Sequence, residues 1–325
     1  MRNVRGVLVA IAVAIVVGLF PSAGFAQREQ AATAGQSAVA NDRPNILWIT
    51  SEDNSPYLGC YGDPQAYTPR LDRLAAEGVR YRNAFANAPV CSTARTTLVT
   101  GMLGCSAGLQ HHRSRVAIPE HFELYPQVLR RAGYYCTNNT KTDYNVANPG
   151  NIWDENSKKA HYRNRPAGKP FFAVFNIGAT HESQVAPKPG KTTFRIAPED
   201  IQLPPYHPDT PELRRDWANY YDQMTELDTQ VGELLDELER LGEADNTIVF
   251  YFSDHGGALP RGKRNIHDSG TRVPMIVRFP KRWAHLAPAE PGQWVEQPVS
   301  FVDLPPTLFS LVGAETPENY QGRAF

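Results

Sequence analysis

The sequence predicts an α/β fold in which a mostly parallel central sheet carries helices on both faces. Short runs of apolar, β-branched and aromatic residues recur along the chain, and they alternate with segments whose apolar residues are three and four positions apart. The first pattern is typical of strands buried on both faces, and the second is typical of amphipathic helices. Their alternation indicates a parallel sheet, and 325 residues suffice to bury its core within one domain.

Four apolar runs account for the predicted strands. They are residues 45–50 (NILWIT), 171–177 (FFAVFNI), 246–253 (NTIVFYFS) and 274–279 (PMIVRF). Each run has six to eight residues and is rich in β-branched or aromatic side chains, as expected for strands that are covered on both faces.

Four further segments predict helices. They are residues 68–78, 92–101, 123–132 and 211–241. In the first segment, Thr68 fits the cap position, Pro69 fits the first turn, and Gly78 ends the helix. Gly133 closes the third segment in the same way.

The longest predicted helix carries an apolar stripe. Its members are Leu213, Trp217, Tyr221, Met224, Leu227, Val231, Leu234, Leu238 and Leu241. Because these residues recur with the helical period, they share one side of the helix and should face the sheet. We expect the Asp and Glu residues of the segment to lie on the solvated side.

The N-terminal residues have the pattern of an export signal. Arg2 and Arg5 precede the apolar run GVLVAIAVAIVVGLF, and small residues follow, so we expect a signal peptide at 1–26 that is cleaved after Ala26. An uncleaved anchor is the alternative, although the run is short for a spanning helix. Residues 27–43 are polar and predict a flexible linker, which leaves 44–325 as the catalytic domain.

Composition narrows the classes of function. The formal net charge of −1 argues against a nucleic-acid binder that works by attraction to phosphates. An exported chain would be periplasmic or secreted, in an oxidising compartment, and without membrane association once its signal is removed. Four cysteines, Cys60, Cys91, Cys105 and Cys136, are too few for a disulfide scaffold, and the sequence leaves open whether any two of them pair.

Polar residues follow three of the predicted strands at the point where each ends. Glu52 and Asp53 follow the first strand, His181 follows the strand at 171–177, and Asp254 and His255 follow the strand at 246–253. The carboxyl ends of parallel strands meet at one edge of a sheet, where ligands bind. These side chains should therefore converge, although a single carboxylate after a strand is more often a cap or a turn residue than a ligand.

Carboxylates gathered at one edge would repel one another unless a cation lies between them. Ca²⁺ and Mg²⁺ prefer oxygen ligands of this kind, and a histidine in the set leaves Mn²⁺ and Zn²⁺ as alternative ions. The sequence thus predicts a divalent metal site.

Residues 91–101, CSTARTTLVTG, resemble the signature of the formylglycine-dependent sulfatase family, which belongs to the alkaline-phosphatase-like superfamily. That signature has a cysteine followed, four positions later, by an arginine at the start of a helix. The stretches that resemble other family segments, in the same order, are residues 43–86, THES at 180–183, SDHG at 253–256, RGKRNIHDSGTRVP at 261–274 and VSFVDLPPTLFSLVG at 299–313.

The resemblance implies that Cys91 is oxidised to formylglycine by a maturation enzyme. The hydrated aldehyde of that residue provides a nucleophilic hydroxyl and later releases sulfate. A helix start favours anions through its free N–H groups, and Arg95 adds a positive charge. Thr93 stands where the family has Pro or Ala, a position that the maturation enzyme reads in an extended conformation, so conversion of Cys91 has to be measured.

Further roles follow from matched positions. The metal ligands implied are Glu52, Asp53, residue 91, Asp254 and His255, with Ca²⁺ as the expected ion and Mg²⁺ or Mn²⁺ as alternatives. The catalytic residues implied are Cys91, Arg95, Lys141, His181 and Lys263. Among these, the two lysines would contact sulfate, and His181 would protonate the leaving oxygen.

His112 and Arg113, in the stretch QHHRS, are candidate contacts to a sugar hydroxyl or to a second anionic group. The resemblance also implies a smaller C-terminal subdomain, which we expect to be largely missing from these 325 residues.

Three functions remain after this reasoning. The first is a periplasmic or secreted sulfatase that hydrolyses sulfate esters or sulfamates of sulfated carbohydrates. The second is a phosphonate monoester or phosphodiester hydrolase of the same superfamily. The third is a truncated, inactive relative that binds sulfated glycans without cleaving them.

Overall fold

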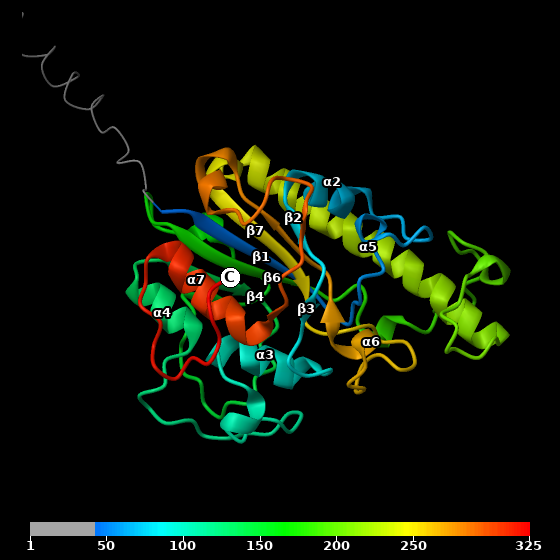
Figure 1. Ribbon diagram of the computed structural model, residues 1–325, viewed down its shortest axis with the longest axis horizontal. Coiled ribbons are helices and arrows are strands. Elements are labelled where there is room, and N and C mark those ends of the chain that lie inside the picture. Colours follow the sequence, from blue (N-terminus) through cyan, green and yellow to red (C-terminus); the bar gives the residue numbers. More distant parts are fainter. Residues whose placement is uncertain (1–42) are drawn as a thin grey trace, which may run out of the picture. The chain divides into compact units, whose positions relative to one another are not determined.

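The computed structural model describes residues 43–325, so the predicted signal peptide and nearly all of the predicted linker lie outside the described residues. The described part belongs to one compact unit, Asn41–Phe325. Its centre is a mixed sheet with the strand order β10-β2-β9-β7-β1-β6-β4-β5, which confirms the predicted α/β class (Figure 1).

The strands of this sheet include all four predicted ones. They are β1 (Asn45–Ser51), β2 (Val79–Tyr81), β4 (Tyr135–Asn139), β5 (Glu155–Asn156), β6 (Phe171–Ile177), β7 (Thr247–Ser253), β9 (Met275–Arg278) and β10 (Trp294–Val295). A small second sheet has the order β11-β3-β8. Its strands are β3 (Ala84–Phe85), β8 (Arg272–Val273) and β11 (Val299–Ser300).

The middle of the large sheet is parallel. Strand β1 pairs in parallel with β6 on one side and with β7 on the other, and β4 extends this arrangement beyond β6. Strand β9 runs antiparallel to β7 and β2. The sequence did not predict β4, because its residues YCTNN turn polar where a buried strand is expected to be apolar.

Helices cover both faces of the sheet. Their bounds are α2 (Pro69–Glu77), α3 (Cys91–Thr100), α4 (Tyr125–Arg131), α5 (Pro211–Arg240), α6 (Asp268–Thr271) and α7 (Leu304–Val312). Helices α3, α4 and α7 pack on one face, and α2 and α5 pack on the other (Figure 1). Among the described residues, no helix combines the length and the apolar character needed to cross a membrane.

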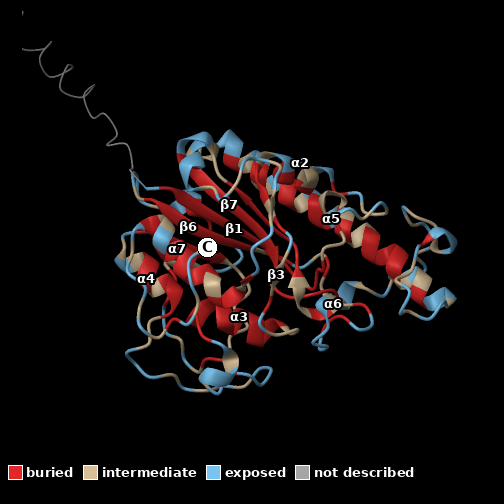
Figure 2. Ribbon diagram, in the orientation of Figure 1, coloured by how far each residue is buried: buried red, intermediate tan, exposed pale blue. Residues whose placement is uncertain are grey.

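Strand β1 supplies both cores because successive side chains of a strand point to opposite faces. Ile46 and Trp48 belong to the core beneath α3, α4 and α7, whereas Leu47 and Ile49 belong to the core beneath α2 and α5. The strands are buried along their lengths, as Figure 2 shows. Trp48 is the centre of an aromatic cluster whose other members are Tyr125, Phe172, Phe250 and Phe252.

The long helix differs from its prediction in two ways. Leu241 lies just past the helix end and is 38% exposed, and Leu234 is only half-buried, while Leu235 takes the inward position. Asp228 is buried instead of solvated. Its carboxylate accepts hydrogen bonds from the backbone N–H groups of Arg70 (3.1 Å) and Leu71 (2.8 Å) at the start of α2, so it satisfies donors that a helix start leaves unpaired.

All four cysteines, Cys60, Cys91, Cys105 and Cys136, are free thiols in the described part of the chain, which contains every one of them. The pairing that the sequence left open is therefore absent. Cys91 is buried and available to the site described below.

Replacing Trp48 by Ala should lower the free energy of unfolding by about 3–5 kcal/mol, because it empties the centre of the aromatic cluster. Urea denaturation followed by circular dichroism measures the change. Leu241→Ala, at an exposed position, is the control and should change stability by less than about 0.5 kcal/mol. Equal effects from both substitutions would contradict the placement of Trp48 at the core.

Candidate active site

Two neighbouring loops follow the carboxyl ends of β1 and β7 at one edge of the sheet. The loops are tied together by backbone hydrogen bonds from Asp254 to Ser51 (3.0 Å) and from Asn54 to His255 (3.2 Å). Asp53 adopts a positive φ of 53°, a conformation that costs energy for a residue other than glycine. This turn directs the Asp53 carboxylate toward the loop after β7, where it meets His255.

Cys91 is the first residue of α3 and reaches the same place from the other side. Its Sγ lies 3.2 Å from His255 Nε2 and 3.8 Å from Asp53 Oδ1, and the residue is 1% exposed. Val90, at the cap position, makes no side-chain hydrogen bond to the helix. The first N–H groups of α3 therefore remain available to an anion next to Cys91.

Four buried side chains form a group that suits a metal ion. Asp53, Cys91, Asp254 and His255 each offer one ligand atom, and these atoms all lie within 4.8 Å of one another. The set combines two carboxylates with an imidazole and a thiol, and every donor is buried, so its chemistry fits a divalent cation.

Charges on neighbouring side chains balance the two carboxylates. Burial acts to raise the pKa of Asp53, but the hydrogen bond and charge of His255, together with Lys263, outweigh burial and hold the pKa well below its usual range. Burial also acts to raise the pKa of Asp254, and the charges of His255 and Arg95 lower it. Both carboxylates are therefore ionised.

His255 carries a proton in this arrangement. Burial acts to lower the pKa of its imidazole, but the charge of Asp254 and the 2.9 Å hydrogen bond to Asp53 outweigh burial and raise the pKa to about 10. The two carboxylates thus already hold a positive charge between them. A metal ion bound there would replace the proton, since a histidine ligand is neutral.

Glu52 is not part of the group formed by Asp53, Cys91, Asp254 and His255. Its carboxylate forms an ion pair with Lys141 and lies 3.9 Å from His181 Nε2. It belongs to a second cluster, with Cys91 and His181, whose donor atoms also lie within 4.8 Å of one another. Whether Glu52 binds the same ion stays a prediction.

Arg95 lies one helical turn after Cys91 and so shares its face of α3. Its Nε donates to Asp254 Oδ2 (3.0 Å), and its Nη1 donates to the side-chain oxygen of Asn176 (2.6 Å). Its Nη2 is buried and has no hydrogen-bond partner among the described residues. Since an unpaired buried donor is costly, this nitrogen is a candidate donor to an acceptor atom of a ligand.

The predicted lysines and His181 surround the same place. Lys263 donates to Asp53 Oδ2 (2.8 Å) and lies 3.2 Å from Glu182 Oε1. Lys141 Nζ lies 4.0 Å from Asp254 Oδ2, in addition to its pair with Glu52. His181 is half-exposed, and its Nδ1 lies 2.9 Å from the Ser183 hydroxyl, which leaves Nε2 on the side of Glu52.

His112 and Arg113 contact the second residue of α3 and not the metal group. His112 Nδ1 lies 2.7 Å from the Ser92 hydroxyl, and the backbone N–H of Arg113 donates to the same oxygen (2.9 Å). Burial lowers the pKa of His112, so the imidazole is neutral at pH 7. The Arg113 guanidinium is exposed and paired with Asp143 (3.2 Å). Both residues therefore lie at the rim of the site.

Sequence reasoning missed Asn176, Glu182 and Arg264. Asn176 is the one polar residue in the apolar run of β6, which is the signal that could have identified it. Glu182 donates its backbone N–H to Asp53 Oδ2 (2.7 Å), and its carboxylate forms a bidentate pair with Arg264 (2.7 and 3.0 Å).

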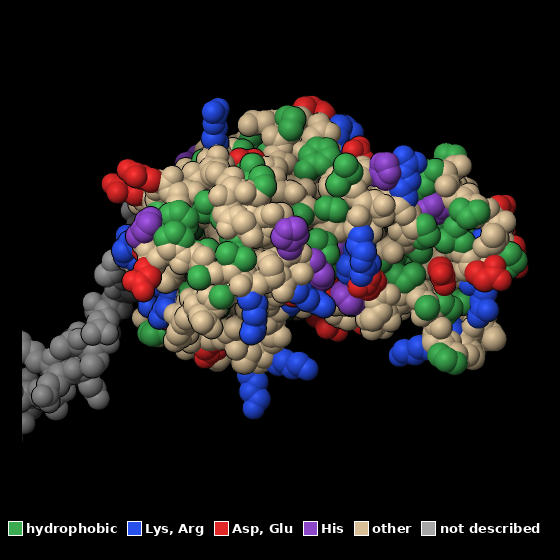
Figure 3. Space-filling view, turned by 90° about the horizontal axis from the view of Figure 1, so that it is seen from below, with side chains coloured by type: hydrophobic (Ala, Val, Ile, Leu, Met, Phe, Trp, Pro, Cys, Tyr) green, Lys and Arg blue, Asp and Glu red, His purple; other side chains and the backbone are tan. Residues whose placement is uncertain are grey.

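Seen from the side of α3 and α6, histidine and basic side chains gather on the surface beside acidic ones (Figure 3).

The geometry brings a helix-start cysteine, an arginine one turn later, two strand-end carboxylates and two lysines into one buried site. The family model described as "Sulfatase" matches residues 44–166 and 135–314.

The chain belongs to the sulfatase family.

An ulvan-active sulfatase from Formosa agariphila is 38% identical over 330 residues, which cover 87% of this chain and 54% of that protein. A second ulvan-active sulfatase from the same organism is 27% identical, with 58% of its length covered. The chain thus spans little more than half the length of these curated relatives.

Solved structures share the fold. Ps i-CgsB in complex with k-i-k-neocarrahexaose matches with a TM-score of 0.65 and 21% identity, covering 86% of this chain and 75% of that one. The phosphonate monoester hydrolase SpPMH from Silicibacter pomeroyi matches with a TM-score of 0.68 and 20% identity, covering 87% and 76%. At these identities the likeness shows the fold alone.

Replacing Glu182 by Gln should lower stability at neutral pH by about 1 kcal/mol or less, the scale of a partly exposed ion pair. The hydrogen bond and charge of Arg264, with Lys263, lower the pKa of Glu182 from 4.5 to about 2. Because the folded-state pKa is depressed, this stabilisation is present above pH 4.5 and is lost as the pH falls toward 2.

Urea denaturation of wild type and Glu182→Gln, at neutral pH and near the lower limit of this window, measures the difference. The free energies of unfolding of the two proteins should differ at neutral pH and become equal in acid. Glu315→Gln, at an exposed position, is the control and should show no such convergence. A difference in the free energy of unfolding that stays the same in acid would contradict the low pKa assigned to Glu182.

Proposed function

We propose that this chain is a sulfatase that hydrolyses sulfate esters of sulfated carbohydrates. The observation that carries the proposal is the position of Cys91 at the start of α3, with its Sγ among the donor atoms of Asp53, Asp254 and His255. Family membership supports the reaction class, and the arrangement of charged side chains supports an anionic substrate.

Asp53, Asp254 and His255 would hold a divalent cation together with residue 91. The excess of carboxylate oxygen favours Ca²⁺, and the histidine leaves Mg²⁺ or Mn²⁺ as alternatives. Bound there, the cation would neutralise the carboxylates and lower the pKa of a hydroxyl on residue 91. Glu52 is a further candidate ligand, although its carboxylate is paired with Lys141.

Conversion of Cys91 to formylglycine by a maturation enzyme would supply a hydroxyl nucleophile and a route for sulfate release. The protein's own contribution is to place that side chain at a helix start whose N–H groups attract an anion. Arg95, whose Nη2 has no hydrogen-bond partner within residues 43–325, adds a guanidinium at the same point.

Three cations would hold the transferred sulfate group. Arg95, Lys141 and Lys263 come from three separate segments and surround the space beside Cys91, where they would stabilise charge that moves toward the leaving atom. His181 would hold a proton at Nε2 for the leaving oxygen, a task that suits an imidazole near neutral pH.

A sulfated carbohydrate is the substrate class that the relatives support, since their names include ulvan-active sulfatases. His112 and Arg113, at the rim, would contact a sugar hydroxyl or a second anionic group. The signal pattern of residues 1–26 supports a periplasmic or secreted location.

The first experiment is mass spectrometry of the tryptic peptide 83–95 from the native host, combined with turnover of 4-nitrophenyl sulfate. Formylglycine should appear at residue 91 as a loss of sulfur and a gain of oxygen. Cys91→Ala should abolish turnover, and Thr93→Pro should raise the converted fraction, because Pro favours the extended conformation.

An unaltered thiol in wild type, without turnover, would contradict the proposal and favour a glycan-binding relative. Faster turnover of an aryl phosphodiester than of the sulfate with the same leaving group would favour the phosphodiesterase alternative instead.

Replacing His181 by Gln should affect substrates according to their leaving group. Turnover (kcat/KM) of a carbohydrate sulfate, which has a poor leaving group, should fall about 100-fold or more, because the alkoxide needs a proton. Turnover of 4-nitrophenyl sulfate should fall much less, because nitrophenolate leaves without one. His111→Gln, in the exposed loop near the rim, is the control, and equal losses on both substrates would exclude proton donation by His181.

A further inference from the structure

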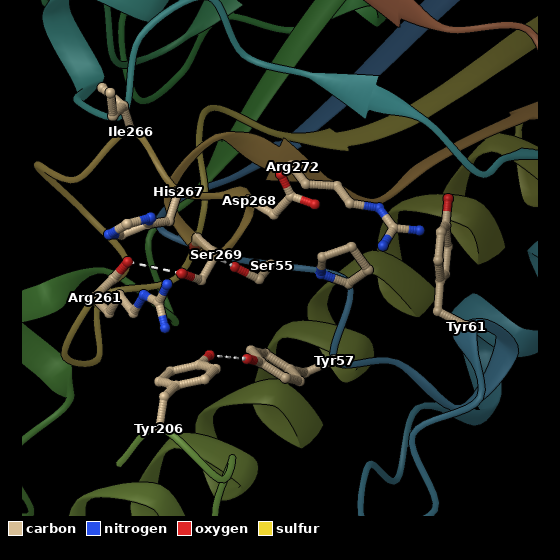
Figure 4. A pocket seen from close by; sticks show the side chains of 11 residues that line it. Ser55, Tyr57, Tyr61, Tyr206, Arg261, Ile266, His267, Asp268, Ser269 and Arg272 are labelled. Carbon is tan, nitrogen blue, oxygen red and sulfur yellow. Dashed lines mark hydrogen bonds between the residues drawn. The ribbon is translucent and has the colours of Figure 1, made fainter.

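A cavity outside the candidate active site is lined by residues of the loops that follow β1 and β7. Its volume is about 660 Å³, within the range of small-molecule sites. In Figure 4, Tyr57 and Tyr206 lie side by side along one edge of the cavity and form what we call its aromatic floor, Arg261 lies near Tyr206, and Arg272 lies on the opposite side beside Tyr61.

The cavity and the active site share a wall. Ser55 lines the cavity two residues after Asp53, and its hydroxyl donates to the Ser269 carbonyl (2.8 Å) and accepts from the Gly257 N–H (2.7 Å). Arg261 lines the cavity two residues before Lys263. Two residues span at most about 7 Å of chain, so the backbone that carries Arg261 lies within that distance of the backbone that carries Lys263.

The aromatic floor is held in place. The hydroxyls of Tyr57 and Tyr206 lie 3.4 Å apart, and Tyr206 is 42% exposed. His207, the next residue, lies 2.8 Å from the carbonyl of Pro260 and accepts a 3.0 Å hydrogen bond from Trp217. The ring of Tyr206 is thus tied to the loop that carries Arg261, and it presents an apolar face to the cavity without needing to be ordered first.

Positive charge predominates in the cavity. The guanidinium of Arg261 lies 4.9 Å from the centre of the Tyr206 ring. Arg272, on the opposite side, is anchored by two hydrogen bonds to the Arg82 carbonyl (3.0 and 2.7 Å). His267 also lines the cavity, and Asp268 is its acidic residue.

We infer that this cavity is a subsite for an anionic sugar unit of the polysaccharide whose sulfate is cleaved. The inference rests on the proposed function. A sugar ring packs its C–H face on aromatic side chains such as Tyr206, and its hydroxyls pair with carboxylates such as Asp268. A sulfate or carboxylate group of the same unit matches the planar fork of an arginine.

The shared loops give the subsite its role. Because the loops that line the cavity also carry Asp53 and Lys263, a polysaccharide held in the cavity would be bound by the same loops that build the reaction centre. The cavity therefore selects chains of two or more units over single sugars.

The test measures binding of dextran sulfate to the whole chain by affinity electrophoresis, with neutral dextran as the reference. Tyr206→Ala and Arg261→Gln should each weaken binding of dextran sulfate about tenfold. The matched controls are Tyr67→Ala and Arg195→Gln, an exposed pair outside the cavity in which the guanidinium lies 3.6 Å from the centre of the ring. These should weaken binding less than twofold, about the effect of an ordinary surface substitution.

Unchanged binding in both cavity variants would overturn the inference, because the polymer would then be held elsewhere. Equal losses in the control pair would also overturn it, because surface charge in general would then explain the binding. Turnover of 4-nitrophenyl sulfate by the unsubstituted chain is measured separately. If that turnover is absent, the proposed function fails, while the binding results still decide whether the cavity takes a sulfated sugar.

Discussion

The site depends on one constraint: Asp53 and Asp254 are buried side by side, and their charge has to be balanced. In a dry interior two carboxylates repel each other, and each loses its hydration. The balance comes from Arg95 (3.0 Å from Asp254) and from Lys263 and His255 (2.8 and 2.9 Å from Asp53). Removing one of these cations would take away part of the charge that balances the two buried carboxylates.

Because the balancing cations come from different segments, the same constraint also fixes the architecture around the site. Arg95 ties α3 to the end of β7, and Lys263 ties the loop at 261–266 to the end of β1. Cys91 lies on the same helix as Arg95, so the ion pair of Arg95 with Asp254 also fixes the position of Cys91. A divalent cation would fit this arrangement without rebuilding it, since it would take over the charge that protonated His255 now supplies.

The loops that complete this charge balance also shape the neighbouring cavity. Lys263 faces the carboxylates on one side of its loop, and Arg261 faces the aromatic floor on the other. One loop therefore contributes to the candidate reaction centre and to the candidate sugar subsite. A substitution in this loop would therefore affect both places.

The sequence by itself determined the four apolar strands β1, β6, β7 and β9, the helices α2, α3, α4 and α5, and the strand-end positions of Asp53, Asp254 and His255, because local pattern and spacing fix these features. It did not determine which side chains form hydrogen bonds or ion pairs with one another. Three pairings depend on which segments pack together: Glu52 with Lys141, Asp228 with the start of α2, and Asn176 with Arg95. Burial selects such pairs across more than 80 residues of chain, and only the tertiary structure brings those residues within hydrogen-bonding distance.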